Sequence, residues 1–175
     1  MKEKLILEPS LNFGEAQSQI ANCKSNIGIE FENQAISEGY KFIAGVDEVG
    51  RGCLAGCVVA AAVILDLSKP LPKFLDDSKK LSAKKRETLD SIIKENAVSY
   101  AIAQVEADEI DKINILEATK KAMRLAIEKL NPSADFLLID ALHLKGHLTP
   151  QKAIIKGDAI SASIAAASII AKNYR

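Results

Sequence analysis

The stretch that decides the fold is Lys41-Phe-Ile-Ala-Gly-Val46, which continues through Asp47-Glu48 and a glycine-containing bend into residues 58–65. Both flanking segments are unbroken apolar runs, and runs of this length and composition are typical of buried strands. The glycines between them permit a sharply bent or closely approached backbone. The sequence therefore predicts a β-hairpin with an elaborate bend that begins at an acidic pair.

Outward from this hairpin, strand patterns alternate with helical ones. We expect further strands at 98–105, 136–139 and 153–156, and helices at 83–96, 115–130 and 161–172. Strands that alternate with helices after an initial hairpin indicate an α/β domain with a mixed β-sheet flanked by helices. We place this domain at residues 40–175 and treat residues 1–39 as an N-terminal extension with one short helix.

Composition excludes several classes of protein. The 175 residues include 48% hydrophobic and 26% charged residues, which is typical of a globular chain and not of a disordered one. No apolar run is long enough to cross a bilayer, so we expect no membrane association. Lys+Arg and Asp+Glu both number 23, so no overall basic charge marks a nucleic-acid-binding protein. Three cysteines without an export signal favour a reduced, cytoplasmic setting, with a monomer as the default.

Acidic residues at the ends of apolar strands are the strongest indication of chemistry. Asp47 and Glu48 follow the first strand, Asp140 ends the strand at 136–139, and Asp158 follows the last one. If these carboxylates converge, each pair ~5 Å apart repels by ~3 kcal/mol at an effective dielectric of ~20. Two divalent cations would cancel the charge, and oxygen ligands suit Mg²⁺ or Mn²⁺. Any one of these acids taken alone fits a helix cap or a turn better than a metal ligand.

Several motifs, in a fixed order along the chain, resemble one family. They are Gly45-Val-Asp-Glu-Val-Gly-Arg-Gly52, Asp77-Ser-Lys-Lys-Leu81, Asn114-Ile-Leu-Glu-Ala-Thr119, Leu138-Ile-Asp140, Lys156-Gly-Asp158 and Ala165-Ala-Ala-Ser-Ile-Ile-Ala-Lys172. Together they resemble the signature of the type 2 ribonucleases H, the ribonuclease HII family. The resemblance extends from about Tyr40 to Arg175.

The resemblance implies a ribonuclease H-like fold and a metal-dependent endoribonuclease. Such enzymes cut the RNA strand of RNA–DNA hybrids. They also nick on the 5′ side of a single ribonucleotide in duplex DNA, leaving 3′-hydroxyl and 5′-phosphate ends. It implies that two Mg²⁺ or Mn²⁺ ions are held during catalysis by Asp47, Glu48, Asp140 and Asp158, with Asp47 shared between them.

The same resemblance assigns residues to the nucleic-acid substrate. The loop formed by Gly50, Arg51 and Gly52 is expected to read the ribose 2′-hydroxyl, because glycines let backbone groups approach the sugar closely. Ser78 and Lys79 are expected to bind phosphate, and Asn114 to contact the nucleic-acid backbone.

Alternatives remain open at this point. A ribonuclease HIII-like enzyme has a similar acidic signature, usually behind a sizeable N-terminal domain. Family members normally continue with further helical sequence after the helix at 161–172, so we expect this chain to be shortened. A shortened chain could be a non-catalytic module that binds hybrids, and a structural metal-binding domain is a third possibility.

Overall fold

A computed structural model of the chain describes residues 27–52, 56–73 and 75–175. Its centre is one five-stranded sheet with the order β3-β2-β1-β4-β5. The strands are β1 (Ile43–Val49), β2 (Val58–Leu65), β3 (Ala97–Val105), β4 (Phe136–Asp140) and β5 (Gln151–Ile154). The first three strands are antiparallel, whereas β4 pairs parallel with β1 and β5 pairs parallel with β4. The expected hairpin and mixed sheet are therefore confirmed.

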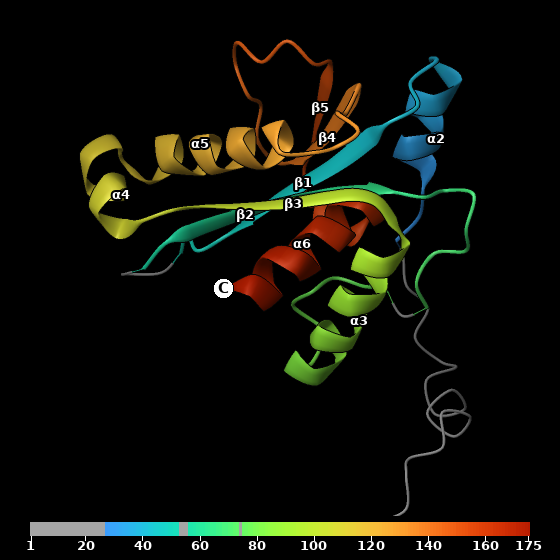
Figure 1. The fold of residues 1–175 in the computed structure, drawn as a ribbon, viewed down its shortest axis with the longest axis horizontal. Coiled ribbons are helices and arrows are strands. Elements are labelled where there is room, and N and C mark those ends of the chain that lie inside the picture. Colours follow the sequence, from blue (N-terminus) through green and yellow to red (C-terminus); the bar gives the residue numbers. More distant parts are fainter. Residues whose placement is uncertain (1–26, 53–55, 74) are drawn as a thin grey trace, which may run out of the picture.

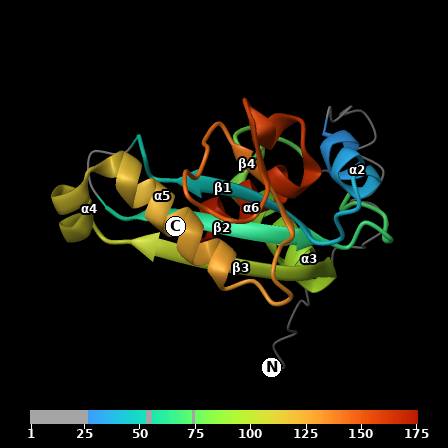
Figure 2. The ribbon, with the colours of Figure 1, turned by 90° about the horizontal axis from the view of Figure 1, so that it is seen from above.

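Helices cover both faces of this sheet (Figure 1). They are α2 (Glu30–Ser37), α3 (Ala83–Asn96), α4 (Ala107–Ile113), α5 (Ile115–Glu128) and α6 (Ala162–Tyr174), with a short 3₁₀ helix, η1 (Gly157–Ala159), before α6. Helix α5 crosses β2 and β3 on one face, and α6 lies on the other face with α3 beside it (Figure 2). No helix in the described ranges is both long and apolar enough to cross a membrane.

Strand β2 is apolar at every position because it is covered on both faces. Val58, Ala60, Ala62 and Ile64 belong to the cluster of buried side chains that includes the inner face of α5. Val59, Ala61 and Val63 belong to the cluster that includes α3 and α6. Successive side chains of a strand point to opposite faces, so a strand between two helical layers must be hydrophobic throughout.

Helix α6 packs unusually close to β1. A Cβ atom added to Gly45 would lie 2.0 Å from the carbonyl carbon of Ser163, so only glycine fits at this position. Asp47 is two residues further along β1 and therefore faces the same helix. The close approach brings α6 directly beneath the acidic end of β1.

The structure corrects several predicted boundaries. Strand β1 runs to Val49, so Asp47 and Glu48 lie within it, paired with Ala61 and Ala60 of β2, rather than after it. Strand β5 covers Gln151–Ile154 instead of 153–156, because the backbone at Lys156 is left-handed (φ 56°) and cannot continue a strand. Helix α4 was not predicted. It is 7 residues long, and only the partly buried Ile110 and Ile113 pack against the core, so its apolar pattern is too short to stand out in the sequence.

The described part of the N-terminal extension packs onto the domain. Glu32 of α2 is fully buried, and its Oε1 accepts hydrogen bonds from Ser161 Oγ (2.7 Å) and from the backbone N of Ser163 (2.9 Å). These two residues form the start of α6, so Glu32 caps that helix from a distant part of the sequence. The boundary at residue 40 stays a prediction, and residues 1–26, with Cys23, lie outside the described residues, as does Cys53.

Candidate active site

The four acidic residues predicted from the sequence line one cavity. Its volume is about 250 Å³, and it lies where β1 and β4 end beside η1. The complete lining consists of Asp47, Glu48, Val49, Gly50, Arg51, Gly52, Lys79, Asp140, Asp158 and Lys172. Eight of the ten predicted site residues are therefore assembled around a single cavity from four separate segments, and Gly50 and Gly52 come from the bend itself.

Each carboxylate is held by a different part of the fold. Val46 of β1 pairs with Ile139 of β4 in parallel register, so Asp47 and Asp140, the next residues of the two strands, lie side by side. Asp140 Oδ1 accepts a hydrogen bond from the backbone N of Gly157 (2.7 Å), which ties β4 to η1. Asp158 is the middle residue of η1 and is only 4% exposed.

The site carries excess negative charge. Burial, and then the neighbouring carboxylates of Glu48 and Asp140, raise the pKa of Asp47 from 3.8 to about 7. Burial also raises the pKa of Asp140, with a further contribution from Asp158. The pKa of Glu48 is raised by burial, although Arg51 opposes this. Carboxyl groups with raised pKa values in one cavity are a recognised mark of a functional site.

Two cations partly balance these acids. Arg51 Nη1 lies 3.4 Å from Glu48 Oε1, and Lys79 Nζ donates to Asp158 Oδ2 at 2.8 Å. The Asp77 side chain accepts a hydrogen bond from the backbone N of Lys79 (2.9 Å). This turn directs the Lys79 side chain towards η1, and its ammonium pKa is raised chiefly by the hydrogen bond to Asp158.

The residues fit a hard divalent cation by their chemistry. Four carboxylates provide oxygen ligands, and Glu48 Oε2 is buried with no hydrogen-bond partner in the part of the chain that the structure describes. As they stand, however, no three acidic, histidine or cysteine side chains among the described residues are arranged to hold an ion. Lys79 pairs with Asp158 in this arrangement, so the carboxylates share a cavity without forming a closed ligand cage.

Four of the six residues that were predicted to bind substrate lie at the cavity. Gly50, Arg51, Gly52 and Lys79 are at the cavity. Gly50 has a φ of 111°, and a Cβ there would lie 2.6 Å from the Cys57 carbonyl oxygen, so the loop requires glycine at this point.

Ser78 and Asn114 lie elsewhere. Ser78 is fully buried and its hydroxyl contacts Ser168 and Lys172. Asn114 is not part of the cavity lining. Its side chain caps α5 by accepting from the backbone N of Leu116 and of Glu117. The structure therefore gives both side chains partners within the protein.

Sequence reasoning assigned no role to two residues that the structure places here. Lys172 lines the cavity, and the Ser168 hydroxyl makes a hydrogen bond that lowers the pKa of Asp47. Both belong to the motif 165–172, in which serine and lysine stand out among alanines and isoleucines on a buried helix. A polar residue on an otherwise apolar helix was the available indication.

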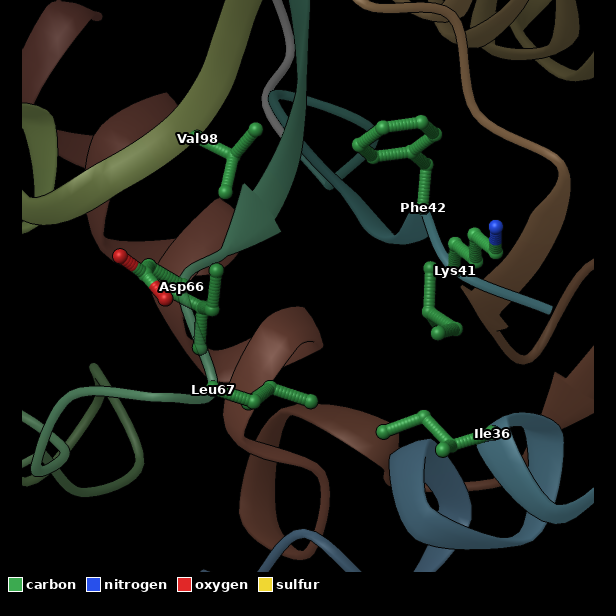
Figure 3. A pocket seen from close by; sticks show the side chains of 8 residues that line it. Ile36, Lys41, Phe42, Asp66, Leu67 and Val98 are labelled. Carbon is green, nitrogen blue, oxygen red and sulfur yellow. The ribbon is translucent and has the colours of Figure 1, made fainter.

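A second cavity, of about 140 Å³, lies at the opposite end of β1. Its walls are largely apolar and include Phe42, Leu65 and Val98, with Lys41 and Asp66 as its charged residues (Figure 3). It gathers no set of carboxylates, so the acidic cavity is the better candidate for chemistry.

An antiparallel three-stranded sheet extended by two parallel strands, with acidic residues from adjacent strands at one end, defines the ribonuclease H-like class. Within this class, the sequence model of the ribonuclease HII family matches residues 44–175, and the chain belongs to that family. The alternative of a ribonuclease HIII is therefore set aside in favour of the type 2 family.

Known proteins agree with this assignment. The chain is 56% identical to a ribonuclease HII from Ruminiclostridium cellulolyticum over 147 residues, which are 84% of this chain and 57% of the relative. It resembles the ribonuclease H2 of Pyrococcus horikoshii (TM-score 0.67, 26% identity, 77% of this chain and 72% of that one). It also resembles a structure of a PCNA–RNase HII complex from Archaeoglobus fulgidus (TM-score 0.66, 29% identity, 77% and 73%). The chain spans about half the length of the curated relatives it matches first.

Proposed function

We propose that this chain is a metal-dependent endoribonuclease that hydrolyses the RNA strand of RNA–DNA hybrids. The observation that carries the proposal is the meeting of Asp47, Glu48, Asp140 and Asp158 around one cavity. Membership of the ribonuclease HII family supports it. The raised pKa values, which come from burial and from the neighbouring carboxylates, support it as well, because a bound cation would offset this concentrated negative charge.

The four carboxylates are the proposed ligands of Mg²⁺ or Mn²⁺. A pair of such ions, if bound by these residues, would lower the pKa of the attacking water and stabilise the leaving 3′ oxygen. Asp47 lies beside both Glu48 and Asp140, so it is the carboxylate best placed to be shared. Lys79 Nζ donates to Asp158 Oδ2, so the second oxygen of that carboxylate can bind an ion while the pair holds. The Lys79 ammonium has further donors that can serve a substrate phosphate.

Discrimination of ribonucleotides is assigned to the loop of Gly50, Arg51 and Gly52. The loop lines the acidic cavity, and its glycines allow backbone groups to approach a ribose 2′-hydroxyl closely. We extend the proposal to nicking on the 5′ side of a single ribonucleotide in duplex DNA. Hydrolysis breaks the bond from phosphorus to the 3′ oxygen and leaves 3′-hydroxyl and 5′-phosphate ends.

Cleavage of two labelled duplexes tests the proposal. One is an RNA–DNA hybrid and the other is a DNA duplex with one ribonucleotide, each incubated with Mg²⁺ or Mn²⁺. We expect both to be cut, and Asp47→Asn to bind substrate without cutting. Asp108→Asn, at a carboxylate 79% exposed on α4, is the control and should cut normally.

Other results would point elsewhere. A hybrid that shifts in a gel but is never cut would indicate a binding module. Cleavage of the hybrid alone would indicate ribonuclease HIII-like specificity. Normal cleavage by Asp47→Asn would contradict the assignment of the site.

A further inference from the structure

A lysine and two serines form a hydrogen-bonded cluster behind Asp47. Lys172 Nζ contacts Ser78 Oγ and donates to Ser168 Oγ at 3.0 Å, and the two serine hydroxyls lie 2.8 Å apart. Ser168 and Lys172 are one turn apart on α6, whereas Ser78 comes from the loop before α3. Both serines are fully buried, so their hydroxyls depend on partners within the protein.

The direction of each hydrogen bond in this cluster follows from the chemistry of its members. A lysine ammonium has three donors and no acceptor, so both serine oxygens accept from Lys172. Each hydroxyl has one proton to donate. Ser168 directs its proton to the Asp47 carboxylate, which can only accept while it is ionised. The bond between the serines must therefore run from Ser78 to Ser168.

We propose that Ser168 is a positioning residue that holds the Asp47 carboxylate for metal binding, and that Ser78 and Lys172 fix the Ser168 hydroxyl as its donor. The inference rests on the proposed function, because it takes Asp47 as a metal ligand. It gives Ser78 a role that needs no contact with phosphate. It also explains why a serine and a lysine interrupt the apolar sequence of α6.

Asp47 depends on this support because its strand leaves it few other donors. The Asp47 Oδ1 atom accepts from the backbone N of Glu48 (2.8 Å), a bond within its own strand. The Ser168 bond comes instead from the opposing helix, which Gly45 allows to approach closely. Two bonds from different directions restrict rotation of the carboxylate, and hydrogen bonds of this kind orient the residues that bind a metal.

Mn²⁺ binding to the full chain, measured by calorimetry without nucleic acid, tests the inference. Ser168→Ala removes only the hydroxyl, on a helix already rich in alanine. We expect it to weaken Mn²⁺ binding by about 10- to 100-fold, the usual loss when a partner of a metal ligand is removed. The matched control is Ser163→Ala, on the same helix. Ser163 is equally buried, and its hydroxyl has no hydrogen-bond partner among the described residues.

Two further measurements separate positioning from a merely structural role. Ser78→Ala keeps every atom of Ser168 but removes its donor, so a smaller, severalfold loss of Mn²⁺ affinity is expected. In cleavage assays at fixed Mn²⁺, Ser168→Ala should lower kcat with little change in KM, and raising Mn²⁺ should restore part of the loss. A structural defect that leaves the ion site intact would not change the dissociation constant for Mn²⁺.

The outcomes distinguish this inference from the proposed function. If Ser168→Ala and Ser78→Ala both bind Mn²⁺ as the wild type does, while Asp47→Asn loses binding, the positioning role is wrong and the metal site stands. If Asp47→Asn itself binds Mn²⁺ and cuts normally, the proposed function fails.

Discussion

At the scale of single residues, Asp47 combines burial with the greatest need for a cation. It is 4% exposed, and two neighbouring carboxylates raise its pKa further. A carboxyl with a folded-state pKa of about 7 and an ordinary value of 3.8 binds its proton more tightly in the folded chain. Its contribution to folding is therefore neutral below pH ~4 and becomes unfavourable as the pH rises towards ~7.

This sign gives a prediction for stability in the absence of metal. Above pH ~7 the ionised Asp47 should cost on the order of 4 kcal/mol of unfolding free energy, at 1.36 kcal/mol for each pKa unit. Asp47→Asn should remove that cost, so it should be more stable than the wild type at pH 8 and lose this advantage near pH 4. Urea unfolding in EDTA at several pH values measures the difference. If the unfolding free energies of the wild type and Asp47→Asn differ by the same amount at every pH from 4 to 8, the raised pKa of Asp47 is wrong.

The acidic residues were predicted from the sequence because they interrupt apolar runs. Their meeting in one cavity could not be predicted from spacing, since the register of β4 against β1 is a tertiary property. The resemblance of the motifs to those of the ribonuclease HII family predicted that these acids share one metal site. Ser78 shows the limit of the motif: its place in 77–81 suggested a contact with substrate, whereas its burial against α6 depends on packing that no local pattern records.

At the scale of elements, the coupling between α2 and α6 links the N-terminal part of the chain to the site. Glu32 satisfies donors at the start of α6, and Ser168 lies further along the same helix. The bounds of β2 and α3 were predicted as observed, because an unbroken apolar run and a helix cap both leave local patterns. The Ser82 hydroxyl, for example, accepts from the backbone N of Lys85 at the start of α3. The Glu32 contact has no such pattern, since its partners are about 130 residues away.

Loss of this cap gives the prediction at the element scale. Glu32→Ala should lower the unfolding free energy by about 2 kcal/mol, since it removes two hydrogen bonds to a buried carboxylate and leaves Ser161 Oγ without its acceptor. Glu30→Ala, at an exposed acid of the same helix, is the control and should change stability by less than about 0.5 kcal/mol. Chemical denaturation measures both. Equal stability of the two variants would mean that Glu32 does not support α6.

At the scale of the whole molecule, the proposed metal site joins segments that are distant in the sequence. Asp47 and Glu48 come from the hairpin, Asp140 from β4 and Asp158 from η1, while Lys79 approaches from the loop before α3. A ligand that binds only when these segments are assembled stabilises the folded state by mass action. At a concentration 100 times its dissociation constant, one ion adds about 2.7 kcal/mol to the unfolding free energy.

The melting temperature of the whole chain should therefore rise with Mn²⁺. For a domain of this size, 1 kcal/mol corresponds to about 2–4 °C, so a saturating ion should raise Tm by about 5–10 °C at pH 8. The increase should shrink at pH 5, where protons compete for the same carboxylates. Asp47→Asn should abolish most of it, whereas Asp108→Asn should retain it. A Tm that rises equally in both variants would place the ion elsewhere on the molecule. Of the two substituted residues, Asp47 lines the cavity and Asp108 does not.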